Sequence, residues 1–117
     1  MRHCFALDLR DDPALIAQYE AHHRAVWPEV SAHLRRQGVR ELEIFRLGTR
    51  LVMLMDTDDA VFDAQRMAVA EHDDPRLRAW EALMWQLQAP TPWTPVGAKW
   101  TSMSSIFHLD SAVGETP

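Results

Sequence analysis

The stretch VRELEIFRLGTRLVMLM, residues 39–55, decides the fold that we predict. Two apolar-rich runs, Val39 to Leu47 and Leu51 to Met55, flank the short segment 48–50, which begins with a glycine. Glycine in so short a connection is typical of a β-hairpin, so the two runs are predicted to pair as antiparallel strands. The hairpin lies in the middle of the chain, and the elements on either side of it set the topology.

On the N-terminal side of the hairpin we expect one strand and two helices. The strand covers His3 to Leu9, where apolar residues alternate. Asp12 and Pro13 then have the residue types of a helix N-cap and a first helical position, and Pro28 starts a second helix. Trp27 immediately precedes that proline and is therefore predicted to form the corner between the two helices.

On the C-terminal side we expect two further helices and a last strand. A helical stretch lies around Val61, Phe62 and Met67, and Asp74 with Pro75 repeats the signal for a helix start. The segment from Ala89 to Ala98 contains three prolines and a glycine, which argues against a regular element. Lys99 to Leu109 alternates between apolar and polar residues and is predicted to be the last strand.

The order strand, helices, strand, strand, helices, strand predicts an α+β fold. With right-handed crossovers it gives a ferredoxin-like split βαβ sandwich, a four-stranded antiparallel sheet with the helices on one face. The other face of such a sheet needs a cover, so we expect a symmetric homodimer, of the dimeric α/β barrel type. Residues 1–110 form the single domain, and 111–117 are expected to be a flexible tail.

Composition and charge narrow the classes of partner. The 117 residues include 12 Lys or Arg and 17 Asp or Glu, a net charge of −5, and the one lysine offers little for neutralising phosphates. We therefore expect no nucleic-acid partner. No apolar run approaches the roughly 20 residues of a membrane span or forms a signal peptide, so we expect no membrane partner. The single cysteine, Cys4, reads as a buried strand thiol and favours a cytoplasmic location.

Candidate chemistry lies on the first predicted helix. Tyr19 and His23 are four residues apart and Trp27 follows at the same spacing, so the three rings share one helical face. This stripe fits the core-facing side of an amphipathic helix. It also fits a sugar site, because an aromatic ring stacks on the apolar face of a pyranose and a histidine can move protons near neutral pH.

Three further residues have both a structural and a functional interpretation. Glu29, in the first turn of the second helix, complements the helix dipole or reaches a substrate. Trp80 is a core residue or a wall of a binding site, and its neighbour Glu81 is solvated or binds a hydroxyl group. The six histidines show no i, i+4 pair, the spacing that places two imidazoles on one metal, and no cofactor motif is visible, so we expect neither a metal nor a cofactor.

The motif Tyr19-x-x-x-His23-x-x-x-Trp27-Pro28-Glu29 resembles the L-rhamnose mutarotase family. The resemblance runs from Phe5 to the closing segment 106–109 and includes Trp80. It implies a dimeric ferredoxin-like fold without a cofactor and the interconversion of the α and β anomers of a 6-deoxy-L-sugar. By position, Tyr19 would contact the sugar, His23 would be the general acid, and Trp80 would line the pocket.

Two positions depart from the rhamnose-type pattern of that family. Leu42 stands where that type has a substrate-binding tyrosine, and its paired tryptophans are here Trp80 followed by Glu81. A site that binds one pattern of hydroxyl groups rejects another strongly. The sequence is more similar to the L-fucose mutarotase members, which share segments such as Trp80-Glu81-x-Leu83-Met84.

Three hypotheses therefore stay open. The first is an isomerase acting on L-fucose, the second is the same enzyme acting on L-rhamnose, and the third is a noncatalytic dimeric ligand-binding module, because ferredoxin-like folds host many functions. In the enzymatic hypotheses His23 protonates the ring oxygen, and Glu29, Glu81 or a water takes the anomeric proton.

Overall fold

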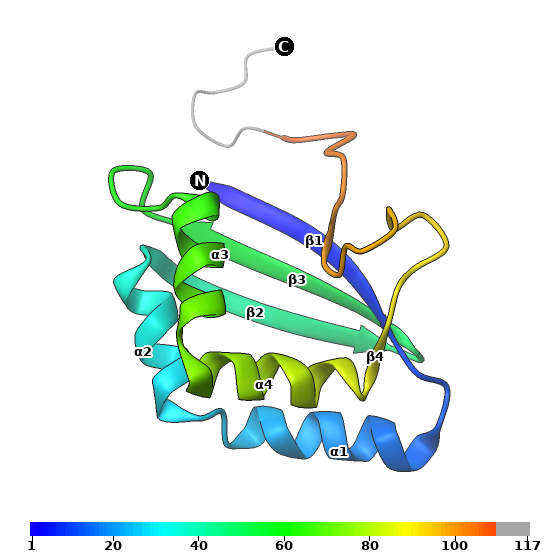
Figure 1. Cartoon of the computed structure of the whole chain (residues 1–117). Coiled ribbons are helices and arrows are strands. Elements are labelled where there is room, and N and C mark those ends of the chain that lie inside the picture. The colour runs from blue at the N-terminus through cyan, green and yellow to red at the C-terminus, as the bar shows by residue number, and fades with distance from the viewer. Residues whose placement is uncertain (110–117) are drawn as a thin grey trace.

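The computed structural model of the chain describes residues 1–109 and forms an α+β sandwich (Figure 1). Its elements in chain order are β1 (Arg2–Leu9), α1 (Pro13–Arg24), α2 (Pro28–Arg36), β2 (Val39–Leu47), β3 (Arg50–Thr57), α3 (Ala64–Asp73), α4 (Pro75–Trp85), β4 (Gln88–Ala89) and β5 (Thr101–Ser102). The flexible tail that we expected at 111–117 lies outside the described residues.

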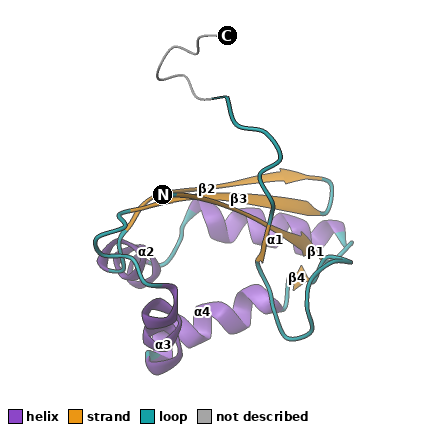
Figure 2. Ribbon diagram, turned by 90° about the horizontal axis from the view of Figure 1, so that it is seen from above, coloured by secondary structure: helices purple, strands orange, loops and turns teal. Residues whose placement is uncertain are grey.

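The sheet has the order β2-β3-β1-β4, with β5 as a further short strand on β1, and every pairing is antiparallel. This order, with the hairpin of β2 and β3 on one side of β1 and the strand after α4 on the other, is the split βαβ arrangement. The predicted ferredoxin-like class is therefore confirmed. Figure 2 shows the helices together on one side of the sheet, while the chain after β5 leaves on the other side.

The helix starts follow the sequence signals because those signals are local. The side chain of Asp12 accepts hydrogen bonds from the first backbone N–H groups of α1, and Asp74 does the same for α4. Proline occupies the first turn of α1, α2 and α4. Gly38, with a φ of 94°, ends α2 and lets the chain turn into β2.

The third helix begins later in the chain than the sequence predicted. The helical stretch expected around Val61, Phe62 and Met67 begins only at Ala64, because Asp63 caps it by accepting from the first N–H groups of the helix. Val61 belongs to the preceding turn, where its N–H donates to the Asp58 carbonyl. The apolar residues of the turn had suggested helix, although the capping residue lies after them.

The predicted last strand, Lys99 to Leu109, is wrong in extent. Only Thr101–Ser102 pairs with β1, and the end of β1 is instead paired by Gln88–Ala89, directly after α4. The expectation that the segment starting at Ala89 lacks any regular element is corrected by one residue. Alternation alone predicted a strand in 103–109, but in the described structure these residues have no partner strand.

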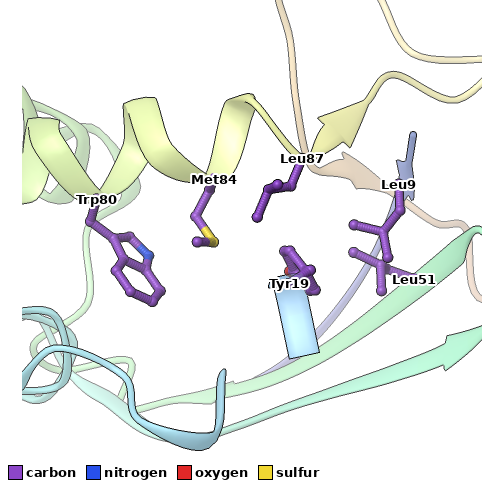
Figure 3. Packing of buried hydrophobic residues seen from close by; sticks show 6 residues of the cluster. All are labelled: Leu9, Tyr19, Leu51, Trp80, Met84 and Leu87. Carbon is purple, nitrogen blue, oxygen red and sulfur yellow. The ribbon is translucent and has the colours of Figure 1, made fainter. Parts of the chain in front are cut away.

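The core fills the space between the sheet and the helices. Leu7 and Leu51 are fully buried on neighbouring strands, and their side chains share the helix-facing side of the sheet. Figure 3 shows six residues of the core cluster: Leu9, Tyr19, Leu51, Trp80, Met84 and Leu87. Two of the aromatic residues that we had identified as candidate site residues therefore belong to the core.

The outer face of the sheet is apolar in its middle. Cross-strand pairing puts Ala6, Val52 and Phe45 side by side on this face. Cys4 and Leu54 pair two residues further along the strands and so lie on the same face. Phe45 is 49% exposed and the others are half-buried, so the thiol that we had expected to be buried is only partly covered. Among residues 1–109, no helix has both the length and the hydropathy that a membrane span requires.

Candidate active site

A cavity of about 400 Å³ lies between the sheet and the helices. Its volume is in the range that small-molecule sites usually have. Strand residues such as Leu42 and Met53 give it an apolar floor, and its titratable and polar lining residues are Tyr19, His23, His33, Glu71, Glu81, Gln88 and Lys99. A smaller hollow of about 330 Å³ between α1 and β2 also touches Tyr19 and His23.

His23 is held in one tautomer by its own helix. Its Nδ1 lies 2.8 Å from the backbone carbonyl of Tyr19, one turn earlier in α1. Because a carbonyl oxygen only accepts, Nδ1 carries a proton in both charge states, and Nε2 is the nitrogen that gains and loses one. Burial lowers the pKa of His23, the bond to the Tyr19 carbonyl opposes this effect, and the charge of His22 adds to it. At neutral pH the imidazole is therefore mainly neutral, with a free lone pair on Nε2.

Tyr19 lies directly against that imidazole. The two ring centroids are 4.2 Å apart, and Tyr19 is 3% exposed. Burial raises the pKa of Tyr19 to about 12, the Gln88 side chain opposes the rise, and the charge of Glu81 adds to it. The phenol therefore keeps its proton and can both donate and accept a hydrogen bond.

Trp80 is both a core residue and a wall of the cavity. Its indole meets the His23 ring edge-on at 5.7 Å and the Trp27 ring at 5.1 Å, and only 7% of the residue is exposed. Trp27 does not line the cavity, and the guanidinium of Arg76 lies 3.6 Å from the centre of its ring. The aromatic rings of α1 are thus joined by Trp80 of α4, which packs against both His23 and Trp27.

The two glutamates predicted from the sequence lie in different places. Glu81 lines the cavity, and its carboxylate accepts a hydrogen bond from the Lys99 ammonium at 2.7 Å. Glu29 is not among the lining residues, is about half exposed, and lies 3.6 Å from Arg76. The structure therefore brings Tyr19, His23 and Glu81 to one cavity, together with Trp80, and leaves Glu29 outside its lining.

Sequence reasoning missed three of the titratable residues in the lining, namely Lys99 and the pair His33 and Glu71. His33 of α2 is 2% exposed, and its Nε2 lies 3.2 Å from Oε1 of Glu71, a residue of α3. The two residues are 38 positions apart on different helices, so no local spacing could have signalled the pair. Within residues 1–109, no three His, Cys, Asp or Glu side chains are grouped as the ligands of a metal ion would be.

Gln88 is a further lining residue that the sequence did not single out. It is 3% exposed and stands in β4, beside the phenol of Tyr19. Its Oε1 is buried without a hydrogen-bond partner among residues 1–109. An unpaired buried acceptor weakens a fold, so this position is one where the cavity wall is not optimised for stability alone.

Comparisons with known proteins agree on one family. The model of the L-rhamnose mutarotase family matches residues 2–109. An L-fucose mutarotase of Xanthomonas campestris is 52% identical over 114 residues, which cover 96% of this chain and 90% of that protein. A UPF0734 protein of Dictyostelium discoideum is 32% identical over 111 residues, which cover 90% of this chain and 86% of the relative.

Two solved structures have the same fold at low sequence identity. An L-rhamnose mutarotase from Formosa agariphila aligns with a TM-score of 0.67 and 17% identity, covering 94% of this chain and 99% of that one. A tetracenomycin F2 cyclase from Streptomyces glaucescens aligns with a TM-score of 0.58 and 20% identity, covering 97% and 99%. With the family match over nearly the whole chain and the relative at 52% identity, the chain belongs to the L-rhamnose mutarotase family and is a sugar mutarotase.

Proposed function

We propose that this mutarotase interconverts the α and β anomers of L-fucose in the cavity around His23. The observation that carries the proposal is the fixed imidazole, which has Nδ1 bound to the Tyr19 carbonyl and Nε2 unpartnered among residues 1–109. It lies in a cavity of about 400 Å³ beside two aromatic rings. Anomer exchange needs little more than a base, an acid and a surface that holds a pyranose.

The preference for L-fucose rests on the relative at 52% identity and on the cavity wall. That relative carries the name L-fucose mutarotase. Leu42, where the rhamnose-type pattern has a tyrosine, lines the cavity, and so does Glu81. Losing a phenol and gaining a carboxylate changes which sugar hydroxyls find a partner. L-Rhamnose is the second candidate, favoured by the family match over residues 2–109.

The protonation state of His23 favours a role that differs from our expectation. A general acid at the ring oxygen must carry a proton at rest, whereas burial lowers the pKa of His23 and favours the neutral form. We therefore assign Nε2 the role of base. It takes the proton of the anomeric hydroxyl as the C1–O5 bond breaks, and it returns that proton when the ring closes.

The remaining predicted residues bind the sugar in this proposal. The buried phenol of Tyr19 keeps its proton and exchanges hydrogen bonds with a hydroxyl group. Trp80 offers apolar surface to the pyranose, and the Glu81 carboxylate, balanced by Lys99, accepts from a second hydroxyl. Glu29 is left at the start of α2, where it complements the helix dipole and pairs with Arg76.

Exchange NMR tests the activity and its substrate. Saturation transfer between the anomeric protons of L-fucose is expected to rise with enzyme concentration, more steeply than for L-rhamnose, with D-glucose as the control sugar. A steeper response for L-rhamnose would assign the enzyme to its second candidate. No acceleration of any of the three sugars would leave the noncatalytic binding module as the function.

We also propose that the protein is a cytoplasmic homodimer joined through the outer face of its sheet. The support is the apolar surface of Phe45, which is 49% exposed, and of the partly buried Ala6 and Val52 beside it, together with the exposed Ile106 and Phe107 in the segment that leaves on the same side (Figure 2). Exposed apolar surface on the face of a sheet is typical of an interaction surface. A cytoplasmic location agrees with a free cysteine beside that surface.

Substitution of Leu54 by lysine tests the dimer. Glu43 lies opposite Leu54 on β2, so the new ammonium gains a cross-strand partner in the free chain, whereas a paired sheet would have to bury it. Sedimentation velocity should show twice the mass of one chain for the wild type and a single chain for Leu54→Lys. Val69→Lys on α3, where the residue is 60% exposed on the helical side, should remain dimeric. A wild type that sediments as a monomer would contradict the proposal.

A further inference from the structure

A second titratable pair lies in the lining of the same cavity as His23, contributed by α2 and α3. His33 is 2% exposed, and its Nε2 lies 3.2 Å from Oε1 of Glu71. The Glu71 side chain is 30% exposed, ten times as much as the imidazole behind it at 3%. The imidazole therefore holds the carboxyl group from the buried side, and the carboxyl group is the accessible member of the pair.

Glu71 differs from the other two carboxylates of this region in its partners. Glu81 is paired with Lys99, and Glu29 lies beside Arg76 outside the cavity lining. Among residues 1–109, Glu71 has no ion pair with a lysine or arginine, and His33 is its one pairing partner. A carboxyl group in apolar surroundings without a cation tends to keep its proton.

The charges around Glu71 come from three sides, and burial outweighs them. Burial raises the pKa of Glu71, and the hydrogen bond and charge of His33 on α2 oppose the rise. The charge of Glu81 on α4 adds to it, and that of Lys99 after β4 opposes it. Glu71 lines the same cavity of about 400 Å³ as Tyr19, His23 and Trp80. Glu71 and the rings beside His23 thus share one small space.

Ring opening needs a proton at the ring oxygen as well as a base at the anomeric hydroxyl. We infer that Glu71 is the catalytic residue that gives this proton and takes it back, and that His33 is the positioning residue that holds it. This inference rests on the proposed function. It replaces neither the hydroxyl-binding role of Glu81 nor the base role of His23.

The proton balance of the step closes without any further reactant. In ring opening, Nε2 of His23 takes the proton of the anomeric hydroxyl, C1=O1 forms, the C1–O5 bond breaks, and Glu71 transfers its proton to O5. After rotation about the C1–C2 bond, the O5 hydroxyl attacks the other face of the aldehyde. Its proton returns to Glu71, and His23 returns its proton to O1, so both residues are restored after each turnover.

Replacement of Glu71 by glutamine tests the inference. The variant keeps the size and polarity of the side chain and removes the proton, so we expect kcat for L-fucose exchange to fall by about 10²-fold or more with little change in KM. Asp73→Asn is the matched control, since this carboxylate ends the same helix and is 72% exposed, and its activity should equal that of the wild type. Circular dichroism and thermal melting establish that each variant is folded.

The pH profile supplies a readout that a structural role would not change. After subtraction of the buffer-catalysed rate, kcat/KM of the wild type should fall at low pH, where Nε2 of His23 is protonated, and at high pH, where Glu71 has lost its proton. Glu71→Gln should retain the acid limb and lose the alkaline limb. His33→Leu should lower kcat by about 10-fold or more through loss of positioning, and His33→Gln, whose amide can still donate to Glu71, should restore most of it.

The outcomes separate this inference from the proposed function. An active wild type with an equally active Glu71→Gln variant would overturn the role of Glu71 and leave the mutarotase intact. A variant that raises KM and keeps kcat would make Glu71 a binding group instead of an acid. A wild type without an alkaline limb would contradict the inference without the use of any variant. A wild type that accelerates no sugar would overturn both.

Discussion

His23→Ala is expected to lower the enzyme-dependent exchange of L-fucose anomers by about 10²- to 10⁴-fold, the usual contribution of one acid–base group. The reason is that Nε2 is the nitrogen left free by the bond from Nδ1 to the Tyr19 carbonyl. Saturation-transfer NMR at several enzyme concentrations measures the effect, and the change should appear in kcat rather than in KM.

The neighbouring residue provides the control for that experiment. His22 lies next to His23 on α1, but it is not part of the cavity lining, and its ring approaches Trp80 from 6.3 Å. His22→Ala should therefore exchange anomers at close to the wild-type rate. An unchanged rate in His23→Ala would refute the assignment of the base, whichever sugar is used.

Trp80→Ala is expected to have the largest effect on stability among the residues of the site. Removing an indole that is 7% exposed should lower the free energy of unfolding by about 3–5 kcal/mol, because it takes away buried surface and leaves a cavity. Urea unfolding followed by circular dichroism measures this change. The folded fraction of the variant should also bind L-fucose more weakly, since the same ring lines the cavity that we propose binds the sugar.

Two companion variants distinguish the core role of Trp80 from its role in the cavity. Trp80→Phe keeps an aromatic ring and should retain most of the stability while weakening sugar binding. Leu87→Ala removes a residue that is 2% exposed in the same core cluster but is not part of the cavity lining. It should cost about 2–5 kcal/mol and leave KM of the folded protein unchanged. A Trp80→Ala variant as stable as the wild type would contradict the burial of this side chain.

Much of the fold could be predicted from the sequence because its signals are local. The pairs Asp12-Pro13 and Asp74-Pro75 start helices through hydrogen bonds and a fixed φ that involve only neighbouring residues. The hairpin turn at Gly48 has a φ of 59°, which glycine adopts readily. These elements and their order were enough to identify the ferredoxin-like arrangement.

The end of the sheet could not be predicted in the same way. Whether an alternating segment becomes a strand depends on a partner edge, and most of the free edge of β1 is left without a long partner. Gln88–Ala89 reaches that edge because α4 ends directly beside it, although proline follows at once. A segment pairs with β1 only where the fold brings it next to that edge, and the alternation of apolar and polar residues carries no information on this.

The sequence predicted those residues of the candidate site that are close together in the chain, but not those that only the fold brings together. Tyr19 and His23 are one helical turn apart, so their proximity follows from the sequence alone. His33 and Glu71 meet only because α2 and α3 pack on the same face of the sheet, 38 residues apart in the chain. Glu29 is the opposite case. It is close to Tyr19 and His23 in the sequence, but its side chain does not line the cavity.

The hydrogen bond from the His23 ring to the Tyr19 carbonyl has an evolutionary consequence. Donor and acceptor belong to the same turn of α1, so the tautomer of His23 does not depend on any residue of the sheet or of the other helices. Substitutions in the apolar walls of the cavity can therefore accumulate without changing this tautomer. Under the proposed mechanism, the sugar preference of this fold can therefore change while His23 keeps the same protonated ring nitrogen.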